Sequence, residues 1–184
     1  MPVLAQEPAL WPEHLFEVAS ESRDSVQWIA LQVRPRTEKI VARYLRTRDY
    51  PFFLPQIERR KRYQRRLVCS HLVLFPGYVF ALSGDQNLDR PLQSKEIIRK
   101  LKVDDQTRLE RELRDIHRLI QSGQPLTREE RLLPSSYARI IRGPLAGLCG
   151  QVIKNSRGQK FVLEVQFLQQ GVSVSIDGAS IEAL

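Results

Sequence analysis

Residues 74–80, Leu-Phe-Pro-Gly-Tyr-Val-Phe, are the most apolar and aromatic run of the chain, and they restrict what the neighbouring sequence can fold into. A short run of aromatic and β-branched residues broken by turn formers predicts a strand, not a helix. Pro76 cannot donate to a sheet, so it should lie at a strand start or a bulge, and Gly77 allows close backbone approach. The strand proper is predicted at residues 78–80, with Tyr78 and Phe80 on one face.

Two interpretations of Tyr78 and Phe80 are open from this pattern. Both rings could fill the core, which is the commoner use of large apolar side chains. Alternatively, one face of the strand packs on the domain while the other offers a hydrophobic docking surface. Periodicity alone favours the core.

The positive charge of the chain is concentrated in one region. The 184 residues carry a net charge of +8, but residues 25–100 contain 16 Lys and Arg against 6 Asp and Glu, whereas residues 1–24 contain 1 against 5. A polyanionic partner is therefore expected to meet residues 25–100.

The densest basic run lies just before the aromatic stretch and surrounds Tyr63. Its six cations are Arg59, Arg60, Lys61, Arg62, Arg65 and Arg66. Strand patterns on both sides predict the outer part of a long hairpin. Such a run could simply be a solvated loop, but cations with an interleaved aromatic favour contact with a nucleic-acid backbone, by charge and by stacking.

Residues 25–123 predict an α+β domain, an antiparallel sheet with flanking helices. Thr37 is the expected N-cap of a first helix, and Thr107 with Glu110 matches a capping box that opens a second, amphipathic helix. The strands are expected at residues 26–33 and 52–54, in the basic hairpin, at 78–80 and near 97–103. Residues 1–24, with three prolines and no sustained period, are predicted to be a mostly disordered acidic extension.

The C-terminal part has a different character. Residues 124–135 are polar and flanked by prolines, which predicts a linker. Residues 136–184 contain closely spaced short strands with glycine turns, a pattern typical of a small β-barrel. The strands are expected at residues 137–142, 148–155, 160–167 and 171–176. Gly147 and Gly150 should allow a tight bend and a close strand approach.

The reactive side chains do not predict an enzyme. Cys69 and Cys149 form no CxxC pair or disulfide framework, which fits a reducing compartment. The three histidines are scattered, and none pairs with a cysteine or acid at the spacing of metal ligands along the chain. Cys69 and His71 share a strand face, but such a pair is only weak evidence for a nucleophile. No phosphate-binding loop, secretory signal or membrane span is found. We therefore expect a cytoplasmic non-enzyme with no cofactor, no metal site and no membrane partner.

Two segments taken together resemble a known family. Phe75-Pro76-Gly77-Tyr78-Val79, before an amphipathic helix, resembles the NGN domain of NusG-type transcription elongation factors, and residues 138–152 look like a KOW motif in an SH3-like barrel. The resemblance covers about residues 26–184. Residues 33–39 and 74–80 are closest to specialised paralogs of the RfaH/UpxY type.

The resemblance implies an elongation or antitermination factor, a monomer that acts at a subset of operons and suppresses pausing or termination. The NGN domain would dock on the clamp helices of the largest RNA polymerase subunit through Phe75, Pro76, Tyr78 and Phe80. This implication reverses the preference for a purely core role of the aromatic residues.

The other partners follow from the same resemblance. Arg34 and Arg36 match a basic edge facing upstream DNA, and the basic run 59–66 could reach the non-template strand of the bubble or the upstream duplex. The barrel would meet Rho or a small-subunit ribosomal protein through Leu145, Leu148, Phe167 and Leu168. Their alternative role is to form the core of the barrel, and for Phe167 the two interpretations are equally supported. The alternative function is a structural, ribosome-associated RNA-binding protein that uses the barrel and the basic hairpin.

Overall fold

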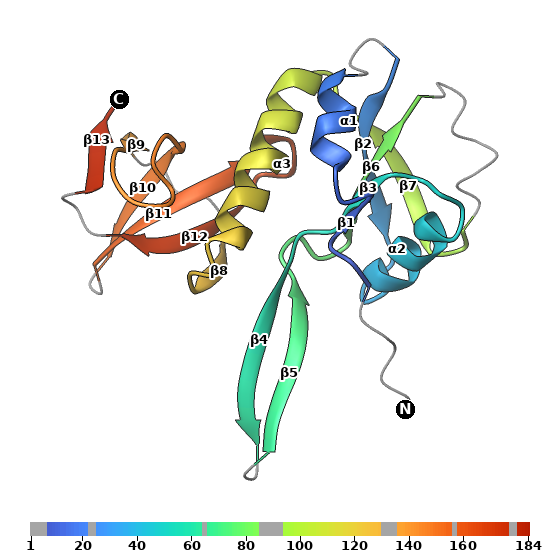
Figure 1. The fold of residues 1–184 in the computed structure, drawn as a ribbon, viewed down its shortest axis with the longest axis horizontal. Helices are drawn as coiled ribbons and strands as arrows, with labels where there is room; N and C mark the ends of the chain where they lie inside the picture. Colours follow the sequence, from blue (N-terminus) through green and yellow to red (C-terminus); the bar gives the residue numbers. More distant parts are fainter. Residues whose placement is uncertain are drawn as a thin grey trace. The chain divides into compact units, whose positions relative to one another are not determined.

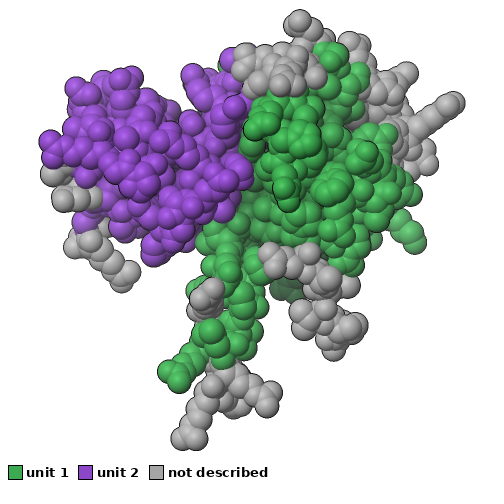
Figure 2. Space-filling model, viewed as in Figure 1, with its two compact units in different colours: residues 1–106 green, residues 107–184 purple. Residues whose placement is uncertain are grey.

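The computed structural model describes residues 7–21, 25–63, 66–84, 94–129, 136–155, 158–176 and 180–184. The chain divides into two compact units, residues 1–106 and residues 107–184 (Figure 2). The first unit is α+β and the second is rich in β-strands, which confirms the predicted fold class.

Unit 1 is built on a five-stranded antiparallel sheet with the strand order β1-β3-β6-β2-β7, and a separate two-stranded ribbon, β4-β5 (Figure 1). Its elements are β1 (Leu10–Trp11), α1 (Leu15–Glu21), β2 (Gln27–Val33), α2 (Glu38–Arg46), β3 (Phe52–Phe53), β4 (Gln56–Tyr63), β5 (Arg66–Val73), β6 (Tyr78–Ser83) and β7 (Ile97–Lys102). The aromatic run therefore leads into β6, the central strand of the sheet, which lies between β3 and β2.

Both faces of this sheet carry buried apolar side chains. One face packs with α2, and the shared cluster consists of Ile29, Leu31, Val33, Val41, Ala42, Leu45, Phe52, Leu54, Val79 and Ala81. On the opposite face, Phe16 of α1 contacts Trp28 and Phe53, with ring centroids 5.9 and 5.4 Å apart respectively. Since β6 is covered on both sides, its consecutive residues 79–82 are all buried. A central strand that is buried on both faces loses the alternation of apolar and polar residues.

The prediction of a disordered extension over residues 1–24 is wrong for residues 7–21. Here β1 pairs with β3 at the edge of the sheet, and α1 packs on the sheet as described above. Glu7 is buried, and its carboxylate pairs with Arg43 and Arg46 of α2. These elements are too short to show a period, and tertiary pairing rather than local pattern fixes them.

Unit 2 contains the helix α3 and a six-stranded antiparallel sheet with the order β13-β9-β10-β11-β12-β8. The elements are α3 (Gln106–Gln121), β8 (Leu126–Glu129), β9 (Ser136–Ile140), β10 (Cys149–Asn155), β11 (Gly158–Val165), the 3₁₀ turn η1 (Gln166–Leu168), β12 (Gln170–Ile176) and β13 (Ile181–Ala183). The four predicted C-terminal strands correspond to β9, β10, β11 and β12.

Two predictions about the junction between the units need correction. Residues 126–129, inside the predicted linker, form β8 and pair with β12 of the sheet. The helix α3, expected to close the first domain, groups with unit 2 apart from its first residue. It begins at Gln106, one residue before the predicted cap, and the carboxylate of Glu110 pairs with Arg114 at 2.7 Å. Thr107 thus lies inside the helix and does not cap it.

The loop between β9 and β10 depends on glycine. Gly147 has a φ of +90°, and its N–H donates to the carbonyl of Ile140 at 2.7 Å. At Gly150 an added Cβ would lie 2.5 Å from the carbonyl oxygen of Val162 and 2.9 Å from Cζ of Phe161. Only glycine permits β10 and β11 to approach this closely. Among the described residues, none of the helices combines the length and apolarity required for a bilayer span.

Candidate functional site

Two sequence segments that were singled out separately meet at one end of the five-stranded sheet. Gln32 pairs with Tyr78 across β2 and β6, and the N–H of Val33 donates to the carbonyl of Gly77 at 2.8 Å. The N–H of Arg34 donates to the carbonyl of Glu96 at 2.9 Å. The basic loop after β2 and the turn before β6 therefore lie side by side.

The turn before β6 is anchored by a buried carboxylate. Gly77 has a φ of +82°, and its N–H donates to Oε1 of Glu38 at 2.7 Å. Glu38, the first residue of α2, is only 6% exposed. A charged acceptor in a buried position makes a strong hydrogen bond. This bond fixes the turn, and with it Pro76 and Tyr78, to the start of α2.

The four residues predicted to dock on a protein partner are not equally accessible. Pro76 is exposed and Tyr78 is partly exposed. Phe75 and Phe80 are both 0% exposed, and their rings form an edge-to-face pair with centroids 6.0 Å apart and an interplanar angle of 83°. The expectation that these two rings present an exposed anchor is contradicted, because both lie in the core.

The basic loop presents its two arginines to solvent. Arg34 and Arg36 are both exposed, and Arg36 adopts a left-handed φ of 68°. The hydroxyl of Thr37 donates to the carbonyl of Arg34 at 2.7 Å, and no side-chain bond caps α2. Thr37 occupies the predicted N-cap position, but its hydroxyl stabilises the loop that displays the arginines.

The basic run lies on the two-stranded ribbon, which extends away from the five-stranded sheet (Figure 1). The exposed residues Arg59 and Arg62 lie on β4. Arg60 and Lys61 occupy register positions on β4 opposite Cys69 and Val68 of β5, Arg66 begins β5, and Arg65 is outside the described residues. The predicted hairpin is therefore present, with cationic residues at consecutive positions of a protruding strand.

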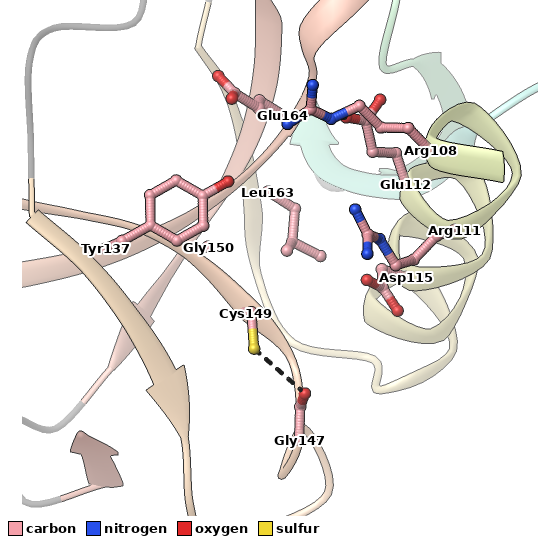
Figure 3. Close-up of a pocket in the computed structure, with 10 residues that line it drawn as sticks. All are labelled: Arg108, Arg111, Glu112, Asp115, Tyr137, Gly147, Cys149, Gly150, Leu163 and Glu164. Carbon is pink, nitrogen blue, oxygen red and sulfur yellow. Dashed lines mark hydrogen bonds and ion pairs between the residues drawn. The ribbon is translucent and has the colours of Figure 1, made fainter. Parts of the chain in front are cut away.

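Unit 2 contains a cavity of about 440 Å³ between one side of α3 and the sheet (Figure 3). Its lining comprises Arg108, Arg111, Glu112, Asp115, Tyr137, Gly147, Cys149, Gly150, Leu163 and Glu164. Burial raises the pKa of Glu112 to about 7, although the N–H of Gln166 and the charge of Arg108 favour the carboxylate. Burial also raises the pKa of Asp115.

The sequence pattern alone does not predict this cavity. The helical spacing of the charged residues on α3 marks a polar side of the helix. Which strands this side would meet depends on tertiary structure.

The residues predicted to bind a partner through the barrel also divide into two groups. Leu145 and Leu148 are 3% and 2% exposed, so they belong to the core of unit 2. Phe167, on the turn η1, is 41% exposed, and Leu168 is partly exposed. Of these four residues, only Phe167 and Leu168 offer apolar surface to a partner.

The molecule is thus a two-unit protein, with an α+β unit that bears a basic ribbon and a β-rich unit. A family model described as transcription termination factor NusG matches residues 26–132, more than half of the chain. The chain belongs to the NusG family, a family of non-enzymatic transcription factors, and this membership implies interaction with RNA polymerase.

Among solved structures, the chain is similar to one described as "Domain interaction in Thermotoga maritima NusG". The sequence identity is 16% and the TM-score is 0.49, and the match covers 88% of this chain and 98% of that chain. Comparison with curated proteins gives no match.

Proposed function

We propose that this NusG-family chain is a cytoplasmic elongation or antitermination factor of the RfaH/UpxY type, which binds the clamp helices of RNA polymerase and acts at a subset of operons. The observation that carries the proposal is the end of the five-stranded sheet. There the exposed Pro76 and the partly exposed Tyr78 lie beside the exposed Arg34 and Arg36. An aromatic and a proline fixed next to cations suit a partner surface that combines protein and nucleic acid.

Within this proposal, the aromatic residues have distinct roles. Tyr78 and Pro76 contact the polymerase directly. Phe75 and Phe80 support them from the core, because their edge-to-face contact fixes the start of β6. Glu38 holds the turn in place through Gly77.

The basic ribbon is assigned to DNA of the transcription bubble or the upstream duplex. Arg59 and Arg62 are exposed on a strand of a two-stranded ribbon, an element that the major groove of a duplex can accommodate. Phosphate contacts of this kind depend on salt, because each neutralised phosphate releases counterions. The double substitution Arg59→Ala/Arg62→Ala is expected to lower the slope of log affinity against log salt by about 2.

Phe167 and Leu168 form the proposed contact with a second partner, Rho or a small-subunit ribosomal protein. The exposed ring of Phe167 on a short turn can enter a pocket, and aromatic anchors of this kind dominate many interfaces.

The test is a pull-down with purified RNA polymerase core, comparing the wild type with Pro76→Ala/Tyr78→Ala. Tyr137→Ala, which removes an exposed tyrosine from unit 2, is the matched control. Loss of binding in the folded Pro76/Tyr78 variant alone supports the proposal. Retained binding in that variant refutes the docking assignment. If the wild type binds structured RNA but no polymerase, the ribosome-associated alternative replaces the proposal.

A further inference from the structure

Three potential metal ligands lie together on one face of the β4-β5 ribbon. Glu58 and His71 are directly opposite each other in the register, and Cys69 precedes His71 by two residues, so all three share a face. The ligand atoms, a carboxylate oxygen, a thiol sulfur and an imidazole nitrogen, all lie within 4.8 Å of one another. Glu58 and Cys69 are exposed, and His71 is half-buried.

We propose that Glu58, Cys69 and His71 bind a divalent metal ion of the zinc class. Thiolate, imidazole and carboxylate are the three ligand types that Zn²⁺ takes in proteins, with bonds of about 2.0–2.3 Å. Two ligands of a tetrahedral ion at these distances are about 3.5 Å apart. The remaining difference from 4.8 Å can be closed by rotation of Glu58 and Cys69 about their side-chain torsions, because both side chains are exposed.

The charge balance of the site suits a dication. A Cys69 thiolate and the Glu58 carboxylate supply two negative charges, and a neutral His71 completes the set, so the bound ion is neutralised. The soft sulfur ligand selects zinc over magnesium or calcium, which prefer oxygen.

The metal would connect the two strands of the ribbon, which in the described part of the chain pair with each other and with no third strand. A lone two-stranded ribbon is marginally stable in water. Glu58 lies on β4, whereas Cys69 and His71 lie on β5, so one ion links both strands and fixes their register. The backbone of His71 is already held, because Nζ of Lys39 on α2 donates to its carbonyl at 2.9 Å. Three protein ligands leave a fourth position for water or for a donor atom of a partner.

Ligand spacing along the chain does not predict this metal site. Cys69 and His71 are two residues apart, but the third ligand, Glu58, is eleven residues before Cys69 in the sequence. Only the register of the ribbon brings it opposite His71.

The test uses the full chain, purified in the presence of a chelator and then desalted. Titration with ZnCl₂ is followed by calorimetry, and titration with CoCl₂ by absorption, where a thiolate-to-cobalt charge-transfer band and tetrahedral d–d bands report the ligands directly. We expect one ion per chain, with slower amide exchange in β4 and β5 after zinc is added. The variants are Cys69→Ser, His71→Asn and Glu58→Ala. Cys149→Ser, which changes the other cysteine, is the control.

Cys69→Ser is expected to abolish the charge-transfer band, and His71→Asn and Glu58→Ala to weaken zinc binding at least about tenfold. Cys149→Ser should bind as the wild type does. The proposal is overturned if the wild type binds neither ion, if any of the three ligand variants keeps full affinity, or if only Cys149→Ser loses the band. Far-UV circular dichroism of each variant excludes loss of the fold as the cause.

Discussion

Gly150→Ala provides a sharp test of the packing of unit 2, because two physical effects predict opposite signs. Gly150 has no left-handed φ, so chain entropy alone predicts that alanine stabilises the fold by about 0.4–1 kcal/mol. The added Cβ, however, would lie 2.5 Å from the carbonyl oxygen of Val162, a backbone atom that cannot rotate away, and 2.9 Å from the ring of Phe161. Overpacking of this kind costs about 1–3 kcal/mol. A contact of 2.5 Å with a backbone atom belongs at the upper end of that range, so after the entropy gain is subtracted we expect a net loss of about 2 kcal/mol.

The assay is native-state hydrogen exchange of the β10 and β11 amides, which reports unit 2 without assuming that the two units unfold together. A loss of about 2 kcal/mol corresponds to exchange that is faster by a factor of about 30. Gly147→Ala is the control: Gly147 has a φ of +90°, and an added Cβ meets no atom within 4 Å. That variant should lose only the stability of about 1–2 kcal/mol that a left-handed backbone conformation costs a residue with a Cβ. Unchanged or slower exchange in Gly150→Ala would refute the steric argument.

Two further predictions concern carboxylates in the two units. Glu38→Ala leaves the N–H of Gly77 without its buried acceptor. We therefore expect the free energy of unfolding of unit 1, measured by urea denaturation, to fall by about 1–3 kcal/mol. A variant as stable as the wild type would show that water replaces the carboxylate. Burial holds the pKa of Glu112 at about 7, above its ordinary 4.5, so the folded chain binds the extra proton and its stability falls as the pH rises from 4.5 to 7. Glu112→Gln should remove this dependence of stability on pH. At alkaline pH it should raise stability in thermal melts by about 1 kcal/mol, after allowance for the partial exposure of the side chain. An unaltered pH profile would contradict the raised pKa of Glu112.

The elements that the sequence predicted are those with a clear local pattern. The alternating and apolar runs of β2, β6 and the C-terminal strands could be read without tertiary information, and so could the basic hairpin. The strand β8 and the elements β1 and α1 could not. Each is short and lies in a polar or proline-containing segment, and each is fixed by pairing or packing with a distant element.

The exposure of the site residues was harder to predict than the elements. Parity places Tyr78 and Phe80 on one face of β6, but it does not say what covers that face at each position. Phe80 pairs with Ala30 and Phe53 well inside the sheet, whereas Tyr78 pairs with Gln32 at its end. Position along the strand therefore separates a core ring from a surface ring, and it follows from the register of the neighbouring strands.

This separation decides how docking experiments on β6 should be interpreted. Phe80 is fully buried against Phe75, and truncation of a buried phenylalanine to alanine costs about 3–5 kcal/mol. That is a large part of the 5–15 kcal/mol that typically holds a domain together. Phe80→Ala is therefore expected to lose polymerase binding through partial unfolding, and denaturation curves should show the loss of stability.

Tyr78→Ala removes a partly exposed side chain and should lower stability by about 1 kcal/mol or less while it weakens polymerase binding. A Phe80→Ala variant with wild-type stability and no polymerase binding would mean that its ring contacts the partner directly. Polymerase binding measured beside urea denaturation for both variants thus distinguishes a docking residue from one that supports it, because only a docking residue loses affinity without losing stability.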